Sequence, residues 1–551
     1  MAASSLFCNA SVLLQLLLLT LPLFRPPPLI TSAAAASTPD QKAAVDNLCS
    51  STPYPDACLQ SLKLSLGINI NVNITGSSPY LLPSLQSAIT EGAKLLALLA
   101  TAGAPGVVET QRSTLQDCLE LQHITLSCLR RSVPLVQSGR RLRSDVRTYL
   151  SAALTNRATC LEGLSVASGP LKGALVGAVA GAYEFVANCL SILSKNAPPP
   201  PAGRGRRLLG SASGGFPSWL SRRDRRLLQS DNGYDPSSVL TVAADGTGNF
   251  TNVGDAVAFA PSNSGDRTII VVRAGVYVEN VVIPSDKTNV VFLGDGRDVT
   301  IIRGSRSVGD GWTTFRSATL AVSAEGFLAR DITFENAAGA AKGQAVALRV
   351  NADLVAFYRC AMSGYQDTLY AHTFRQFYRE CDVSGTVDFI FGNAAVSFQG
   401  CNIFPRRPLS GQYNAITAQG RDDPNMNTGT SIQNCTVVAS AELLAAAGAA
   451  SIKTYLGRPW KPYSRTVFMK TYMGELVDAA GWTEWDGTTG LDTLYYGEYA
   501  NVGPGSATDG RVTWPGYRVM SYDEAVDFTV DQLIDGYGWL ESTSFPYDDD
   551  V

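Results

Sequence analysis

Histidine is nearly absent from this chain, with two among 551 residues, and the G-x-S-x-G turn that often carries a catalytic serine does not occur. Ester and peptide hydrolysis often uses a serine or cysteine activated by histidine, so these absences argue against that class. His123 lies in a helical stretch, and we expect His372 to have a structural or supporting role. Without a histidine cluster, no metal site is predicted.

The N-terminal apolar run falls short of a membrane span. Residues 12–24 are almost all apolar, about the length of a signal-peptide core and below the ~20 residues that a spanning helix needs. Small residues at 33–36 offer a cleavage site, although no basic residue precedes the run. We predict a signal peptide over residues 1–36 and a secreted protein. An uncleaved membrane anchor is the alternative.

The two halves of the chain differ in charge. Residues 1–228 hold 21 Lys and Arg against 11 Asp and Glu, whereas residues 229–551 hold 23 against 37. The net charges of +10 and −14 sum to the −4 of the whole chain. The acidic second half argues against a nucleic-acid partner.

Cysteine usage suits an oxidising compartment. Of 11 cysteines, Cys8 lies in the leader, six lie between Cys49 and Cys189, and four lie between Cys360 and Cys435. Two even sets in two regions favour disulfides. Sequons for N-glycosylation, each a weak signal alone, occur at Asn73, Asn249 and Asn434.

Residues 196–230 have the composition of an exposed linker, with a proline run followed by Gly, Ser and Arg. The tetrad Arg-Arg-Leu-Leu occurs there twice, at residues 206–209 and 225–228. A solvated basic hinge would explain the composition. The duplication favours processing, because a protease cuts an extended, accessible backbone most easily.

Two structured parts flank this linker. Residues 41–195 have apolar residues at helical spacing, which predicts an all-α helical bundle. Residues 231–551 contain short runs of β-forming residues, broken by Gly, Asp and Asn and without helical patterns between them. This pattern predicts an all-β solenoid rather than a βαβ sheet.

Two segments 21 residues apart repeat one pattern. Cys360 and Cys381 are each followed by Ser-Gly at the third and fourth positions and by an aspartate at the seventh, Asp367 and Asp388. A period near 20 residues is typical of a parallel β-solenoid, in which each period closes one coil. Because adjacent coils lie about 4.8 Å apart, we expect the two carboxylates to be neighbours.

Neighbouring carboxylates predict an acid beside a nucleophile, because two such groups do not both ionise readily at neutral pH. Calcium held between stacked aspartates is the competing interpretation. Gln366 precedes Asp367, and Gln344 lies 22 residues earlier, about one coil upstream. Amide donors there suit a developing oxyanion better than a cation, although a structural side-chain ladder is also possible for the glutamines.

Five segments match, in order, the signature segments of plant pectin methylesterases (pectinesterases), which the chain resembles from about Ser238 onward. The segments are residues 275–279 (GVYVE), 344–348 (QAVAL), 366–370 (QDTLY), 388–393 (DFIFGN) and 456–460 (LGRPW). The resemblance implies a right-handed parallel β-helix. The first half resembles the plant invertase and pectin methylesterase inhibitor domain, which implies a four-helix bundle preceded by a disulfide hairpin.

The resemblance implies hydrolysis of the C6 methyl esters of homogalacturonan. Asp388 would attack the ester carbonyl, and Arg458 would hold it ionised. Asp367 would protonate the departing methanol and then act as base, while Gln344 and Gln366 would donate to the oxyanion. The residues expected to contact the polysaccharide are Thr314, Gln344, Phe391, Arg458 and Trp460.

Disulfide expectations differ between the halves. In the first half, the resemblance implies bonds between Cys49 and Cys58 and between Cys118 and Cys160, with Cys189 free and Cys128 extra. In the second half, spacings of about one coil favour bonds between Cys360 and Cys381 and between Cys401 and Cys435.

The resemblance also implies partners and a location. Methyl-esterified pectin would be the substrate, a subtilisin-like protease would cut at the tetrads, separate inhibitor proteins would bind, and the protein would be a monomer in the cell wall (apoplast) without a cofactor. The helical half would inhibit the enzyme or assist its folding until cleaved. Two other functions stay open: a binding module that regulates other esterases, which the intact Asp, Gln and Arg set disfavours, and a calcium-dependent pectate lyase.

Overall fold

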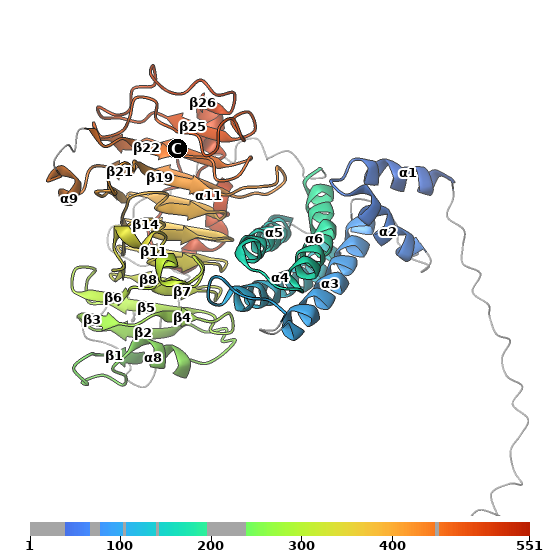
Figure 1. The fold of residues 1–551 in the computed structure, drawn as a ribbon, viewed down its shortest axis with the longest axis horizontal. Helices are drawn as coiled ribbons and strands as arrows, with labels where there is room; N and C mark the ends of the chain where they lie inside the picture. The colour runs from blue at the N-terminus through green and yellow to red at the C-terminus, as the bar shows by residue number, and fades with distance from the viewer. Residues whose placement is uncertain (1–38, 67–77, 103–105, 139–142, 196–238, 447–450) are drawn as a thin grey trace, which may run out of the picture.

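The computed structural model describes residues 39–66, 78–102, 106–138, 143–195, 239–446 and 451–551. Figure 1 shows a group of helices beside a tall stack of strands. We call the helical part, residues 39–195, the bundle, and residues 239–551 the solenoid. The predicted signal peptide at 1–36, the sequon at Asn73 and the linker tetrads lie outside the described residues.

Six helices form the first part, and they confirm the predicted helical fold. The first two, α1 (Pro39–Ser50) and α2 (Pro55–Leu66), make a hairpin that the Cys49–Cys58 disulfide closes. The four longer helices are α3 (Ser78–Thr101), α4 (Thr114–Gln137), α5 (Arg143–Val166) and α6 (Lys172–Lys195). Both α3 and α5 pack against α4 and α6, which makes a four-helix bundle.

A second disulfide, Cys118–Cys160, joins α4 to α5. Both bonds are those that the resemblance implies, and Cys128 and Cys189 are buried thiols. By length and composition alone α6 could cross a membrane, but 67% of its apolar stretch is buried in this structure. It is therefore one of the helices that form the core of the bundle.

Parallel strands form the second part, as the 21-residue repeat predicts. Successive strands pass from one sheet to the next, so that most coils contribute a strand to each of three sheets. The 11-stranded sheet comprises β1 (Val239–Val242), β2 (Thr268–Val272), β5 (Val290–Gly294), β8 (Leu328–Arg330), β11 (Val355–Tyr358), β14 (Arg375–Arg379), β17 (Ala395–Gln399), β20 (Gly429–Gln433), β23 (Arg465–Met469), β25 (Tyr495–Tyr499) and β26 (Tyr517–Val519).

The other two sheets complete the coils of a parallel β-helix. The 8-stranded sheet comprises β3 (Gly275–Val278), β6 (Thr300–Gly304), β9 (Thr333–Asn336), β12 (Ala361–Ser363), β15 (Asp382–Gly385), β18 (Asn402–Pro405), β21 (Thr436–Val437) and β24 (Tyr472–Met473). The 7-stranded sheet comprises β4 (Val281–Ile283), β7 (Leu320–Val322), β10 (Leu348–Val350), β13 (Leu369–Ala371), β16 (Ile390–Gly392), β19 (Asn414–Gln419) and β22 (Thr454–Gly457).

Equivalent side chains stack inside the coils. Phe357, Tyr378 and Phe398 occupy paired positions on adjacent strands, with ring centroids 5.0 and 4.7 Å apart. Corners leading into the 8-stranded sheet are turned by residues with positive φ, such as Arg359 at 53° and Glu380 at 51°. The repeat thus fixes both the core and the bends of the chain.

The last residues run along the outer face of the 11-stranded sheet. Apolar side chains of α11 and the segment after it pack there, and the carbonyls of Asp548 and Asp550 accept hydrogen bonds from Gln399 and Gln433. The short helices of the solenoid are α8 (Val253–Phe259), α9 (Ala441–Leu444), α10 (Tyr522–Val526), α11 (Val530–Ile534), η1 (Val308–Asp310), η2 (Ala340–Lys342), η4 (Gly536–Gly538) and η5 (Leu540–Ser542).

The four cysteines of the solenoid are buried thiols, so the structure does not form the predicted Cys360–Cys381 and Cys401–Cys435 bonds. Each cysteine directly precedes a strand of the 8-stranded sheet, in register with its neighbours. Side chains that point the same way from adjacent strands keep their Cβ atoms about 4.8 Å apart, whereas a disulfide needs roughly 3.5–4.5 Å. In-register stacking therefore explains why these four thiols are not paired in this structure.

Thiol counting tests this result. Residues 229–551, unfolded in guanidinium without reductant, are expected to react with four equivalents of a thiol reagent, one for each buried cysteine of the solenoid. The same sample reduced beforehand is the control and should give the same count. A lower count before reduction than after it would show a disulfide between coils.

Candidate active site

Backbone hydrogen bonds between coils hold the predicted catalytic residues on one ladder. The Ala345 N–H donates to the carbonyl of Gln366 at 3.2 Å, and the Asp367 N–H donates to the carbonyl of Val387 at 3.1 Å. The ladder brings together, on three successive coils, Gln344, then Gln366 with Asp367, then Asp388. The side chains of both glutamines are partly exposed, as donors to a bound molecule must be.

A bidentate ion pair fixes Asp388. The Nε and Nη2 atoms of Arg458 donate to the two carboxylate oxygens of Asp388 at 2.8 and 2.6 Å. Arg458 Nη1 also donates to the Tyr413 hydroxyl at 3.0 Å, and the guanidinium lies 4.3 Å from the ring centroid of Trp485. This fork-to-fork geometry both orients the carboxylate and favours its ionised form.

The two aspartates differ in how easily they ionise. Burial raises the pKa of Asp367 well above its ordinary value, the charge of Asp388 raises it further, and Arg458 opposes both effects. Burial also raises the pKa of Asp388, but the hydrogen bonds and charge of Arg458 hold that rise in check. Burial and the charge of Asp388 therefore favour the protonated form of Asp367, whereas Arg458 favours the ionised form of Asp388.

Both aspartates also have uncommon backbone geometry. Asp367 has φ of 62° and Asp388 has φ of 53°, the left-handed region that aspartate enters more readily than most residues. Such positions concentrate at functional sites, where the surrounding structure must hold them. Here the inter-coil hydrogen bonds of the ladder provide that support.

Aromatic side chains line the same face of the solenoid. Tyr370 stacks on Phe391 at 4.1 Å, and Trp460 meets the edge of Phe391 at 6.0 Å. Phe391 is buried while Trp460 is partly exposed, and the predicted contact residue Thr314 is partly exposed in the loop before β7. These residues form a wall beside the carboxylates that can stack on sugar rings.

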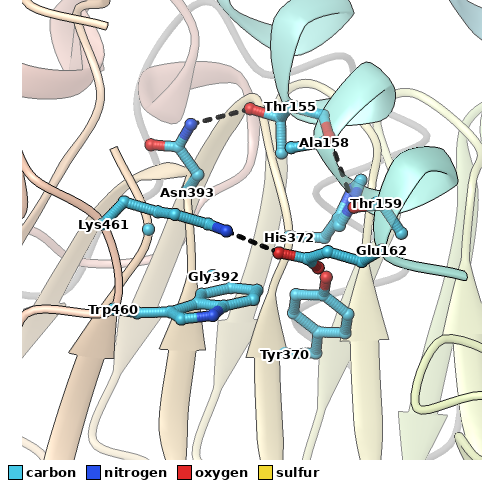
Figure 2. Close-up of a pocket in the computed structure, with 11 residues that line it drawn as sticks. Thr155, Ala158, Thr159, Glu162, Tyr370, His372, Gly392, Asn393, Trp460 and Lys461 are labelled. Atoms are coloured by element: carbon cyan, nitrogen blue, oxygen red, sulfur yellow. Dashed lines mark hydrogen bonds and ion pairs between the residues drawn. The ribbon is translucent and has the colours of Figure 1, made fainter. Parts of the chain in front are cut away.

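Helix α5 of the bundle lies over this wall (Figure 2). Thr155 accepts a hydrogen bond from Asn393 at 2.8 Å, and Glu162 pairs with Lys461 at 2.7 Å. In Figure 2, Glu162 lies above the ring of Tyr370. The helix therefore covers the aromatic part of the site.

Helix α4 covers the neighbouring part of the same face. Leu121 packs into the cluster formed by Phe315, Tyr370 and Phe391. Asp117 accepts a hydrogen bond from Thr313 at 2.6 Å. Apolar and polar contacts from the bundle thus meet on the face of the solenoid that carries the aromatic wall. We call this face the groove.

His372 lies at this boundary. It is fully buried, its Nε2 is 2.8 Å from the Thr159 hydroxyl of α5, and it contacts the edges of Phe315 and Tyr370. Burial, followed by the charge of Arg349, lowers its pKa well below the ordinary value, so the ring is neutral. These contacts agree with the expected supporting role.

Four residues of the site were not predicted from sequence: Arg349, Tyr370, Tyr413 and Trp485. The first two carry a signal, because Arg349, Tyr370 and Phe391 are spaced 21 residues apart and pair across adjacent strands. Extending the repeat from the aspartates to these positions would have found them. Tyr413 has no such signal, since it lies in a loop outside the period.

Comparison with known proteins shows the family of both parts of the chain. The Pectinesterase family model matches residues 239–537, and the model described as Plant invertase/pectin methylesterase inhibitor matches residues 43–192. The chain belongs to the pectinesterase family. It is a pectin methylesterase that carries an inhibitor-like helical domain.

Individual relatives extend over the same parts of the chain. Probable pectinesterase/pectinesterase inhibitor 12 of Arabidopsis thaliana is 53% identical and covers 100% of both chains. Pectinesterase 1 of Citrus sinensis is 45% identical over 91% of this chain and 87% of its own. The solved pectin methylesterase from carrot is 56% identical, with a TM-score of 0.56, and covers 57% of this chain and 98% of its own.

The ion pair of the site predicts a pH shift for this pectinesterase. Arg458 lowers the pKa of both Asp388 and Asp367, so Arg458→Gln should raise both values. If hydrolysis needs Asp388 ionised, the variant should lose activity on acidification at a higher pH than the unsubstituted protein. If it needs Asp367 protonated, the variant should also stay active to a higher pH on alkalinisation. Methanol release by residues 229–551, measured as a function of pH, should show both the acidic and the alkaline end of the activity profile at a higher pH.

A matched control is Arg273→Gln, because Arg273 forms an exposed pair with Asp295, away from the ladder. Its profile should overlay that of the unsubstituted protein. If Arg458→Gln lowers the activity at every pH but leaves the acidic and alkaline ends of the pH–activity profile at the same pH, the assignment of these two carboxyls is contradicted.

Proposed function

We propose that this pectinesterase is secreted to the plant cell wall and hydrolyses the C6 methyl esters of homogalacturonan through Asp388 and Asp367, and that its bundle blocks the groove until the linker is cut. The observation that carries the chemistry is Asp388, held by the two hydrogen bonds of Arg458, one coil away from Asp367, whose pKa burial raises well above its ordinary value. It supplies a nucleophile and an acid without histidine, serine or cysteine.

The first half of the reaction forms an acyl-enzyme. An oxygen of Asp388 attacks the ester carbonyl carbon, and the carbonyl π electrons move onto oxygen, where Gln344 and Gln366 donate hydrogen bonds. When the carbonyl re-forms, the bond to the methoxy oxygen breaks and Asp367 gives that oxygen its proton, which releases methanol. An anhydride between Asp388 and the galacturonyl group remains.

The second half regenerates the enzyme. Asp367, now ionised, takes a proton from water as the water oxygen attacks the galacturonyl carbonyl, and the bond to Asp388 breaks. The product leaves as a carboxylic acid that ionises in solution, while Asp388 returns to a carboxylate and Asp367 to an acid. Arg458 stabilises the leaving carboxylate of Asp388 through the same two hydrogen bonds.

The calcium-dependent alternative fits the site poorly. A cation between the aspartates would need both carboxylates as ligands, but the guanidinium of Arg458 already occupies both oxygens of Asp388. Two glutamine side chains on the ladder supply further donors. The arrangement therefore favours an oxyanion over a metal ion.

Blockage by the bundle is supported by the contacts of α4 and α5. Leu121, Thr155 and Glu162 sit on the aromatic wall where a sugar chain would stack. Substrate and bundle cannot occupy that wall together. Removal of the bundle by cutting the linker, which the two tetrads suggest, would open the groove.

Secretion, glycosylation and processing are parts of the same proposal. Asn249 and Asn434 are both exposed in the solenoid, so a glycan could be attached to either. A subtilisin-like protease would cut at a linker tetrad, separate inhibitor proteins would compete with the bundle for the groove, and the released enzyme would act as a monomer on methyl-esterified pectin.

Methanol release tests the chemistry. Residues 229–551 should release methanol from methyl-esterified pectin, and Asp388→Ala should lower kcat by about 10⁴-fold or more, because the covalent route is lost. Gln366→Ala should cost about 10²-fold through the oxyanion. Tyr472→Ala, an exposed aromatic far from the ladder, is the control. Unchanged activity in Asp388→Ala, or an unsaturated product, would reject the proposal.

Blockage can be tested in the uncut chain, which should release methanol more slowly than the same chain after the linker is cleaved. Thr159→Arg places a long charged side chain against buried His372 and should raise the activity of the uncut chain toward that of the cleaved one. Glu91→Arg on α3, a partly exposed position within the bundle, should leave it low. Equal activity before and after cleavage would leave the bundle with only a folding role.

A further inference from the structure

Arg406 joins successive turns of the solenoid at the level of the ladder. It directly follows β18, in the turn that leads to the 7-stranded sheet, and the same turns of the two preceding coils carry the predicted catalytic aspartates. The Arg406 N–H donates to the carbonyl of Gly385 at 2.7 Å. Its side chain reaches one coil further back, where Nη1 donates to the carbonyl of Gly364 at 3.0 Å. One arginine thus connects three turns in a row.

The guanidinium of Arg406 is held from several sides. Its Nε and Nη2 atoms donate to Glu442 of α9 at 2.9 and 2.7 Å, and Nη2 also donates to the Tyr365 hydroxyl at 2.7 Å. The guanidinium carbon lies 3.9 Å from the centroid of the Tyr365 ring, and the Tyr365 hydroxyl donates to Glu442 at 3.3 Å. We call Arg406, Tyr365 and Glu442 the clamp. All three belong to the solenoid, so the clamp remains when the bundle leaves.

Gln366 depends on its backbone for its direction. In the described part of the chain its side-chain amide makes no hydrogen bond, and the side chain is partly exposed. An oxyanion donor must lie about 3 Å from the developing charge, and a displacement of about 1 Å can cost about 10²-fold in rate. Gln366 directly follows Tyr365, and Arg406 holds both the Tyr365 side chain and the Gly364 carbonyl. The clamp therefore fixes the segment from which the Gln366 side chain projects.

The clamp is separate from the charges that set the two aspartates. The pKa of Asp367 depends on burial, on the charge of Asp388 and on Arg458, and the pKa of Asp388 depends on burial and on Arg458. Arg406 is not among these groups, and its own charge is paired with Glu442. Its loss should therefore leave both pKa values in place.

We propose that Arg406, held by Glu442 and Tyr365, is a positioning residue that aims the Gln366 amide at the oxyanion. The inference rests on the proposed function, because the oxyanion role of Gln366 is part of it. Supporting contacts of this kind hold a reactive side chain in its productive geometry. Through Glu442, the loop after β21 contributes to a reaction that takes place three coils earlier.

Kinetics of the chain cleaved at its linker, with methyl-esterified pectin as substrate, test this role. Arg406→Gln should lower kcat about tenfold, less than loss of the donor itself, and leave KM within about twofold, because the oxyanion forms only during the reaction. Both ends of its pH–activity profile should stay at the pH of the unsubstituted protein, in contrast to Arg458→Gln. Glu442→Gln should lower kcat in the same way but less.

A double variant separates positioning from general support of the fold. If Arg406 acts through Gln366, adding Arg406→Gln to Gln366→Ala should leave kcat within about twofold of that of Gln366→Ala alone. If the two losses multiply, the clamp does not aim Gln366 and the proposal is rejected. Arg303→Gln is the matched control, because Arg303 pairs with Glu335 at 2.7 Å on the 8-stranded sheet. It should keep the kcat of the unsubstituted protein.

The outcomes separate the clamp from the chemistry. Circular dichroism checks each fold, and if Arg406→Gln does not fold, Glu442→Gln takes its place in the double variant and decides the matter. Unchanged kcat in both single variants, or a displaced pH profile, overturns the positioning role while the proposed function stands. If Gln366→Ala keeps full kcat while Asp388→Ala is inactive, the oxyanion role of Gln366 is wrong and this inference falls with it. If the unsubstituted protein releases no methanol, the proposed function itself fails.

Discussion

In-register stacking of the coils is the constraint on which the rest of this structure depends. Because strands of adjacent coils pair residue for residue, a side chain at one position lies about 4.8 Å from its equivalent in the next coil. The same rule that stacks Phe357 on Tyr378 in the core sets Asp367 and Asp388 in adjacent coils beneath the bundle. A repeat that stabilises the fold thus also places two carboxyls in adjacent coils, one of which pairs with Arg458.

The groove has two surfaces of different character that meet at Tyr370. On one side, aromatic rings and the Arg458–Asp388 pair suit an uncharged ester. On the other, Arg316 and Arg349 pair with Glu120 of the bundle. The bundle matches both, with Leu121 on the rings and acids on the arginines, so its docking depends on these local contacts rather than on the net charges of the two halves alone.

Sequence reasoning reached the fold and the centre of the site because both are periodic. The 21-residue repeat predicts the coils and the neighbouring aspartates, and the helical spacing predicts the bundle. The prediction of disulfides in the solenoid was wrong, because equivalent side chains on adjacent strands keep their Cβ atoms about 4.8 Å apart, farther than a disulfide allows. The docking of α4 depends on contacts between residues such as Asp117 and Arg316, which lie 199 positions apart without any shared period.

The segment that follows α11 ties coils together along the outer face of the 11-stranded sheet, through the carbonyls of Asp548 and Asp550. The ribosome synthesises this segment after all the coils that the segment holds together, whereas it synthesises the bundle before the first coil. During synthesis the bundle therefore precedes every coil, and the outer face of the 11-stranded sheet is secured last. The two meet at Arg375, which pairs with Asp145 of α5 and with Asp535 at the end of α11.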